Sequence, residues 1–232
     1  MVKKEFRERL NNLKLGYEPR IVIGISTQEK ILTSFAVQLM RIRDLYDDII
    51  EDIIFSFEKP VNVSRNTVMT KFLVEHPYAT HLLILDDDVF VPEDFLISLL
   101  EAQAAANCMM SSGFLVKKDP PHYPQMCVKM SPGAYAPITD WSGRYIIVDV
   151  LGFGCLLIFR RVLQDIPYPF CVSDVQSEDY YFFSKCSVYG YKVVVDTELV
   201  CGHIGYYVYT KDDFQKYHNI VKASGVQVIR QD

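Results

Sequence analysis

The sequence has no long apolar run, no excess of basic residues and no closely spaced cysteines, and each absence argues against a class of protein. No stretch of the 232 residues approaches the roughly 20 apolar residues that a helix needs to cross a bilayer, so we expect no transmembrane segment. Lys and Arg number 24 against 29 Asp and Glu, a net charge of −5. Because nucleic-acid-binding domains usually carry a basic face, we do not expect nucleic acid as a partner.

The cysteines include no C-x-x-C pair, which argues against a zinc knuckle. Most of them stand among apolar neighbours, as small core residues do. We expect reduced thiols and a cytoplasmic protein, although the sequence leaves a disulfide open. The six are Cys108, Cys127, Cys155, Cys171, Cys186 and Cys201.

Residues 1–19 mix basic and acidic side chains and contain no apolar core of the kind a signal peptide has. They predict a helical lead-in to the first strand. Two interpretations of its charges are open: a solvated helix, which charge runs usually form, and a short basic helix that touches a membrane surface.

Strand and helix patterns alternate three times in the first half, which predicts parallel βαβ units. In such sheets, ligand sites lie beyond the carboxyl ends of the strands. The 50% hydrophobic fraction is enough for the core of one α/β domain over residues 1–232. The strand patterns cover residues 20–26, 52–57 and 81–85, and the helical patterns cover residues 31–45, residues 63–75 and the segment after Pro92.

The second half is less regular. Residues 117–143 are rich in Pro, Gly and Tyr and form an excursion long enough to suggest a functional loop. Residues 177–189 predict an amphipathic helix with Gly190 at its C-terminal cap. Strands are expected at residues 108–116, 145–150, 154–159, 192–196 and 199–201.

Asp86, Asp87 and Asp88 directly follow the third strand pattern. Three adjacent carboxylates repel one another unless a cation or hydrogen-bond donors offset their charge. Alternate residues of an extended segment share a face, so Asp86 and Asp88 together suit Mg²⁺ or Mn²⁺, with a diphosphate completing the shell. The alternative is an acidic turn that caps the helix after Pro92.

Glu178 and Asp179 fall in the first turn of the helix expected after Ser177. The helix dipole favours ionised carboxylates there. An ionised carboxylate can accept a proton from a sugar hydroxyl, as a general base must. Complementarity to the dipole, without a catalytic role, is the other interpretation.

His203 lies between Gly202 and Gly205 just after a strand, on open backbone. A neutral imidazole is a good ligand for Mn²⁺. A structural histidine is the alternative.

Together these segments resemble the nucleotide-sugar-dependent glycosyltransferases of the GT-A fold, especially enzymes similar to family 2. The resemblance covers roughly residues 20–205 and implies an α/β, Rossmann-like three-layer α/β/α sandwich with a mixed, mostly parallel sheet. It is carried by residues 64–67 (SRNT), 82–95 (LLILDDDVFVPEDF), 152–163 (GFGCLLIFRRVL), 177–183 (SEDYYFF) and 190–205 (GYKVVVDTELVCGHIG).

The resemblance implies a role for each matching residue. Asp88 and His203 would bind the divalent metal, and Asp86 would share the metal or contact the ribose. Asp179 would be the catalytic base of an inverting enzyme, or would position the acceptor in a retaining one; inversion is slightly preferred. The nucleotide-sugar site would comprise Ser26, Thr27, Arg65, Asp86, Asp87, Gly152 and Gly154, while the acidic base-reading residue usual after the second strand has only a weak candidate, Glu58.

The same likeness divides the chain into a nucleotide-binding half at residues 20–116, an acceptor and catalytic half at residues 117–205, and a tail at residues 206–232. The tyrosines at 206, 207 and 209 and Lys211 suit a lid over the donor or an ordinary packed extension. Trp141 suits stacking on an acceptor sugar or a packing role. Glu178, beside Asp179, is a further candidate for the acceptor site.

The predicted function is transfer of a sugar from a UDP- or GDP-linked donor to a hydroxyl of a glycan, protein or lipid-linked acceptor. Fold alone does not determine function, so a non-catalytic sugar- or partner-binding module remains an alternative. A D-x-D phosphohydrolase is a weaker one, because Val89 and Phe90 follow the aspartates. The sequence leaves open the sugar, the acceptor, the linkage and the oligomeric state.

Overall fold

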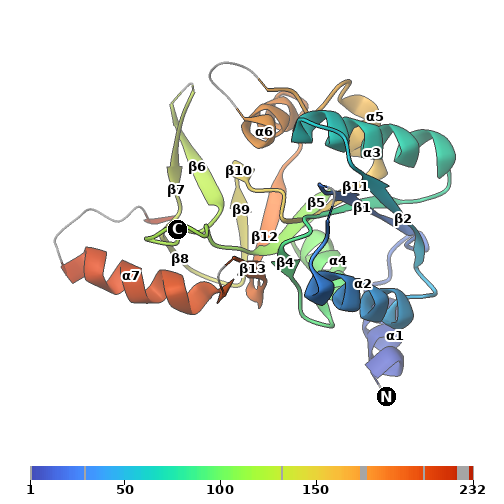
Figure 1. The fold of residues 1–232 in the computed structure, drawn as a ribbon, viewed down its shortest axis with the longest axis horizontal. Coiled ribbons are helices and arrows are strands. Elements are labelled where there is room, and N and C mark those ends of the chain that lie inside the picture. Colours follow the sequence, from blue (N-terminus) through green and yellow to red (C-terminus); the bar gives the residue numbers. More distant parts are fainter. Residues whose placement is uncertain are drawn as a thin grey trace.

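The computed structural model describes residues 2–28, 30–131, 133–172, 177–205, 207–223 and 230–231. A seven-stranded sheet runs through its centre in the order β2-β1-β3-β11-β5-β12-β9 (Figure 1). Its strands are β1 (Ile21–Ser26), β2 (Ile50–Ser56), β3 (His81–Leu85), β5 (Met110–Phe114), β9 (Tyr145–Val148), β11 (Cys155–Phe159) and β12 (Val193–Val200).

Five of these strands run in one direction. β1 pairs in parallel with both β2 and β3, and β5 pairs in parallel with β12. β11 lies antiparallel between β3 and β5, and β9 is antiparallel to β12 at the edge. The sheet is therefore mixed and mostly parallel, as the sequence predicts.

Helices cover both faces of the sheet (Figure 1). The strands alternate their apolar side chains between the two layers: Ile21, Ile23 and Ile25 pack with one set of helices, whereas Val22 packs with the other. One layer contains α1 (Val2–Asn12), α2 (Thr33–Leu45) and α4 (Phe95–Ala106), and the other contains α3 (Val61–Glu75), α5 (Arg160–Asp165) and α6 (Glu178–Val188).

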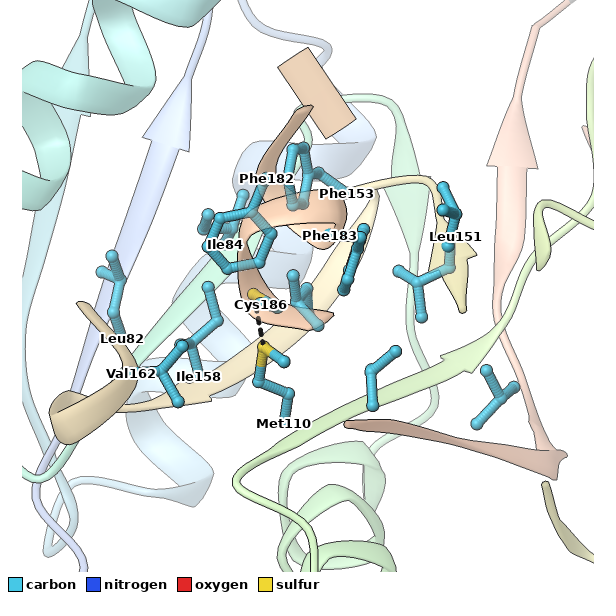
Figure 2. Close-up of a cluster of buried hydrophobic side chains, with 14 of the residues drawn as sticks. Leu82, Ile84, Met110, Leu151, Phe153, Ile158, Val162, Phe182, Phe183 and Cys186 are labelled. Atoms are coloured by element: carbon cyan, nitrogen blue, oxygen red, sulfur yellow. Dashed lines mark hydrogen bonds between the residues drawn. The ribbon is translucent and has the colours of Figure 1, made fainter. Parts of the chain in front are cut away.

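The core beneath α6 positions the start of that helix (Figure 2). Phe153 packs against Phe182 and Phe183 with ring centroids 5.4 Å and 5.7 Å apart, and all three side chains are buried. Further along the helix, Cys186 Sγ lies 3.9 Å from Met110 Sδ on β5. Because the helix is anchored on its buried face, its first turn is held at a defined place above the sheet.

The segment at residues 117–143 is more regular than the sequence predicts. It contains the hairpin strands β6 (Met126–Ser131) and β7 (Ala134–Pro137) and the short strand β8 (Asp140–Trp141). The hairpin projects beside the sheet (Figure 1), and α7 (Lys211–Ala223) packs on β8 through the stacked rings of Phe214 and Trp141. The remaining short strands are β4 (Val89–Phe90), β10 (Val150–Leu151), β13 (Gly202–Ile204), β14 (Val208–Tyr209) and β15 (Arg230–Gln231).

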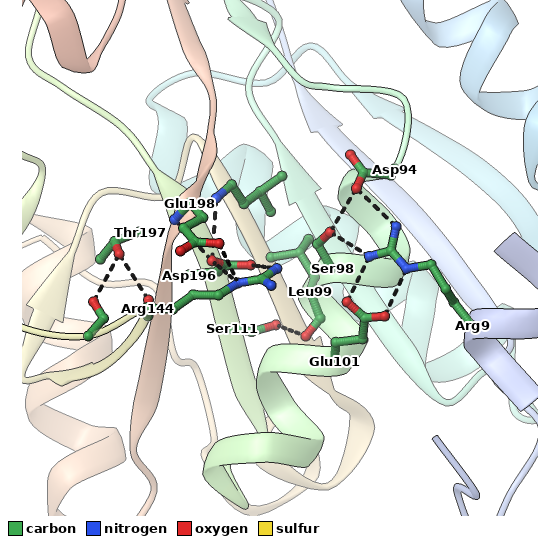
Figure 3. A network of polar contacts seen from close by, with 12 residues as sticks. Arg9, Asp94, Ser98, Leu99, Glu101, Ser111, Arg144, Asp196, Thr197 and Glu198 are labelled. Carbon is green, nitrogen blue, oxygen red and sulfur yellow. Dashed lines mark hydrogen bonds and ion pairs between the residues drawn. The ribbon is translucent and has the colours of Figure 1, made fainter. Parts of the chain in front are cut away.

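Two strands expected at residues 192–196 and 199–201 are one continuous strand, β12. In the sequence, the polar residues Asp196, Thr197 and Glu198 separate two apolar runs and suggest that the strand is interrupted there. However, Asp196 is fully buried and pairs with Arg144 at 2.9–3.0 Å (Figure 3), and the strand continues to Val200 with an irregularity in its pairing with β5 after Asp196.

The six cysteines are free thiols, three of them buried. No helix among the described ranges is long and apolar enough to span a membrane.

The N-terminal helix α1 is docked on the body of the protein. Phe6 is 6% exposed and stacks on Tyr46 with ring centroids 5.4 Å apart. Arg9 donates hydrogen bonds to Glu101 at 2.7–2.8 Å and to Asp94 at 3.0 Å (Figure 3). The helix α1 therefore forms within the expected N-terminal lead-in. One of its faces is packed on the body of the protein, and several of its basic side chains have acidic partners within the chain.

We predict that Phe6→Ala lowers the free energy of unfolding by about 3 kcal/mol, because it removes a buried aromatic ring and leaves a cavity. Lys4→Ala is the control, because the Lys4 side chain is 84% exposed, and it is expected to stay within about 0.5 kcal/mol of the wild type. Denaturant unfolding curves measure both. Equal stability of the two variants would show that α1 is not packed on the body.

Candidate nucleotide and metal site

Asp86, Asp87 and Asp88 lie just beyond the carboxyl end of β3, between β3 and the short strand β4. Gln38 of α2 holds β4 in place: its Nε2 donates to the Val89 carbonyl at 2.9 Å, and its Oε1 accepts from the Val91 amide at 2.9 Å. The Gln38 side chain that makes both hydrogen bonds is buried. It keeps the chain extended immediately after Asp88.

β13 brings His203 beside Asp88. It pairs antiparallel with β4, with His203 opposite Val89, and the Ile204 amide donates to the Asp88 carbonyl at 2.7 Å. As a result, His203 Nε2 lies 3.6 Å from Asp88 Oδ1. Two residues far apart in the sequence therefore converge at the rim of the sheet.

The second ring nitrogen of His203 is held by the backbone. Nδ1 lies 2.9 Å from the Val116 carbonyl oxygen, which can only accept a hydrogen bond. Gln125 Nε2 donates to the same oxygen at 3.3 Å and lies 3.2 Å from Nδ1. A proton on Nδ1 leaves the Nε2 lone pair directed toward Asp88, as a metal-ligating histidine requires.

Lys118 contacts the other oxygen of Asp88. Its Nζ donates to Oδ2, and the two side chains are 35% and 31% exposed. Burial favours the protonated carboxyl, but the interactions with His203 and Lys118 outweigh it and lower the pKa of Asp88. Asp88 is therefore ionised at neutral pH.

The pair of Asp88 and His203 fits a divalent cation as two of its ligands. A hard cation such as Mg²⁺ sits at about 2.1 Å from its ligand atoms, so two of them lie roughly 3–4 Å apart. Within the described part of the chain, no three His, Cys, Asp or Glu side chains are grouped to hold a metal. The rest of the shell would have to come from a bound diphosphate and water.

Asp86 is engaged elsewhere. Its carboxylate accepts from Arg65 Nη2 at 3.2 Å, and Arg65 Nη1 donates to Glu178 at the start of α6. The guanidinium also lies over the Phe153 ring, 4.6 Å from its centroid. Arg65 thus joins the D-x-D segment to α6, while Asp86 is not drawn into the pair formed by Asp88 and His203.

Asp87 accepts a hydrogen bond from the Thr27 hydroxyl. Burial, together with the neighbouring charges of Asp88 and Asp86, raises the pKa of Asp87, although Thr27 opposes the shift. The Thr27 amide donates to the Ser56 carbonyl at 3.0 Å, which continues the pairing of β1 with β2.

A cavity of about 230 Å³ opens next to these residues. It collects several of the side chains that the sequence assigns to a nucleotide, and it adds Lys59 and Ser64. The weak candidate Glu58 also lines it and accepts a hydrogen bond from Ser56 Oγ at 3.2 Å. The lining residues from the predicted nucleotide-sugar set are Ser26, Thr27, Arg65, Asp86 and Asp87, and the predicted metal ligand Asp88 lines the cavity as well.

Gly152 and Gly154, just before β11, stand where neighbouring side chains come too close to leave room for a Cβ. A Cβ at Gly152 would lie 2.1 Å from Gln125 Oε1, and one at Gly154 would lie 2.7 Å from Leu115 Cδ1. The Gly154 carbonyl accepts from the Asp86 amide at 3.1 Å. Gly154 is therefore bonded to the acidic segment through its backbone. Gly152 packs against Gln125, which contacts His203.

Asp179 lies in the first turn of α6, as expected, and is half-buried. Its carboxylate accepts from the Ser177 hydroxyl and from the Tyr180 amide at 2.8 Å. Its neighbour Glu178 is the one tied to Arg65. The two adjacent carboxylates consequently have different surroundings.

Trp141 and Lys211 pack against each other. The Trp141 ring lies 5.2 Å from Phe114 and stacks on Phe214 at 5.9 Å, and Lys211 Nζ lies 5.4 Å from the indole. The structure thus gives Trp141 the packing contacts that were one of its two interpretations. Of the suggested lid, Tyr207, Tyr209 and Lys211 are described, whereas Tyr206 lies outside the described residues.

Sequence reasoning missed Lys118, Gln125 and the contact between Arg65 and Glu178. Lys118 has a recognisable signal, because it is the second of two lysines directly after the strand expected at residues 108–116. Gln125 sits inside the long excursion and carries no local signal. Only the fold shows that it reaches His203.

No protein-family model matches the chain. No curated protein matches it in sequence. Among solved structures, the chain is similar to A197 from STIV, with a TM-score of 0.58 and 23% identity over 80% of this chain and 86% of that chain. At this identity the likeness shows the fold alone, and the chain has a GT-A-like, Rossmann-type α/β sandwich.

Proposed function

We propose that this chain is a metal-dependent glycosyltransferase that moves a sugar from a UDP- or GDP-linked donor to a hydroxyl acceptor. The observation that carries the proposal is the convergence of Asp88 and His203, 3.6 Å apart, beside a cavity lined by Ser26, Thr27 and Arg65. In a sheet of this kind, ligands bind beyond the carboxyl ends of the strands, where this cavity lies.

Asp88 and His203 would hold Mn²⁺ or Mg²⁺, whose positive charge stabilises the nucleoside diphosphate as it leaves. The charges of the site support a polyanionic ligand despite its acidic residues. Arg65 and Lys59 line the cavity, and Lys118 contacts Asp88 at its rim. The buried Arg65 Nε also has no hydrogen-bond partner within the described residues. Ser26 and Thr27 would contact the nucleotide next to Asp87, whereas Gly152 and Gly154 make room for Gln125 and Leu115 and so would support the site from within the protein.

Asp179 would act as the base of an inverting reaction. Its carboxylate would take the proton of the acceptor hydroxyl as that oxygen bonds to the anomeric carbon and the diphosphate oxygen departs. Glu178 is less suited to this role because the Arg65 guanidinium is bonded to it. The acceptor would approach from the side of α6 and the β6–β7 hairpin, and its class is open among glycans, proteins and lipid-linked sugars.

We expect a panel of UDP- and GDP-sugars to yield one donor that binds and is hydrolysed with Mn²⁺ and not with EDTA. Asp88→Ala should weaken Mn²⁺-dependent donor binding by about 100-fold or more, because even residues that only orient metal ligands contribute about 10–100-fold. Calorimetric titration measures the affinity. Donor binding of unchanged strength in Asp88→Ala would contradict the metal assignment.

Asp179→Asn is expected to lower kcat about 10²–10⁴-fold while the donor Kd stays near the wild-type value, because a base acts in the chemical step and not in donor binding. Glu178→Gln is a matched control with the same loss of one negative charge. It should lower kcat less than Asp179→Asn. If Asp179→Asn transfers sugar at the wild-type rate, or lowers kcat no more than Glu178→Gln does, Asp179 is not the base.

A further inference from the structure

Lys118 is the nearest protein cation to the candidate metal ligands. Its ammonium group bonds to Oδ2 of Asp88 while His203 faces Oδ1 of the same carboxylate. The ammonium group and the candidate metal position therefore lie on the two oxygens of one carboxylate.

The loop that carries Lys118 is anchored, so that only the side chain needs to move. The Lys117 amide donates to the Tyr123 carbonyl at 2.9 Å, and the Gln125 amide donates to the Leu115 carbonyl at 2.8 Å. The lysine stem runs past Gly205, where an added Cβ would lie 3.5 Å from Lys118 Cδ. The side chain is one-third exposed and has open solvent on part of its length.

A divalent cation and an ammonium group repel each other strongly at the distance of one carboxylate. A cation that arrives alone at Asp88 Oδ1 and His203 Nε2 must either bind beside the ammonium group on Oδ2, against this repulsion, or displace Lys118 and leave it without that partner. A cation that arrives with a diphosphate brings new anionic oxygens to which the ammonium group can bond. Binding of the cation should therefore be weak alone and strong together with the diphosphate.

We propose that Lys118 is a latch on the metal site: it occupies Asp88 in the donor-free protein and transfers to the diphosphate when cation and donor bind together. The proposal rests on the proposed function. It assigns Lys118 a positioning role in donor binding. The divalent cation and the nucleoside diphosphate then strengthen each other's binding by the same factor, because coupling between two bound molecules is reciprocal.

The first test uses Mn²⁺ alone, measured by electron paramagnetic resonance of the free ion at constant pH and ionic strength. Lys118→Met should bind Mn²⁺ about two- to fivefold more tightly than the wild type, the range expected for releasing one partly exposed ion pair. Lys117→Met is the matched control, because it removes the adjacent positive charge without touching Asp88, and it should match the wild type. Equal affinity in Lys118→Met and Lys117→Met would overturn the latch.

The second test repeats the Mn²⁺ titration in the presence of UDP and of GDP. In the wild type, the nucleotide that binds should raise Mn²⁺ affinity substantially, and Lys118→Met should reduce this enhancement by about tenfold. Lys118→Arg should restore part of it, since it keeps a positive charge at the same place. An enhancement as large in Lys118→Met as in the wild type would overturn the proposal.

The two arms separate this proposal from the function on which it rests. If Asp88→Ala abolishes Mn²⁺ binding but Lys118→Met leaves it unchanged, the metal site stands and the latch fails. If neither Mn²⁺ nor Mn²⁺ with nucleotide binds to any variant, the metal-dependent function and the latch fail together. Thermal unfolding of Lys118→Met and Lys118→Arg shows that both variants are folded before either is interpreted.

Discussion

The pairing of β4 with β13 is the constraint on which the candidate site depends. Each strand is very short, yet the Ile204 amide bonds to the Asp88 carbonyl at 2.7 Å and sets His203 opposite Val89. The buried Gln38 amide holds β4 from the other side. Backbone hydrogen bonds, and not attraction between the two side chains, therefore bring the carboxylate and the imidazole together. This pre-organisation is what a metal site needs from its scaffold.

Three adjacent aspartates are tolerated because each has a different partner. Asp86 pairs with Arg65, Asp87 accepts from Thr27, and Asp88 lies between His203 and Lys118. These partners come from α3, the end of β1, β13 and the segment after β5. The repulsion that makes the D-x-D pattern conspicuous in the sequence is thus offset by elements that the fold collects from the whole chain.

Local patterns predicted the parts of the fold that are buried on both faces. β1 and β3 are continuous apolar runs, and the acidic residues directly after β3 stand out against them. The half-exposed β6–β7 hairpin has no comparable pattern. The sequence predicts two strands in place of β12 because Asp196 is polar, although its side chain is buried. Contacts of Arg65 with Glu178, and of Lys118 with Asp88, depend on how distant segments pack, and no local pattern encodes them.

The central claim is that one cation binds between Asp88 and His203 together with a nucleoside diphosphate. Crystals grown with Mn²⁺ and UDP or GDP, with diffraction data collected at the manganese absorption edge, test it most directly. We predict a single anomalous peak within coordination distance of Asp88 Oδ1 and His203 Nε2, with the diphosphate on its open side. A nucleotide bound in the cavity with the manganese elsewhere, or with no manganese at all, would contradict the account.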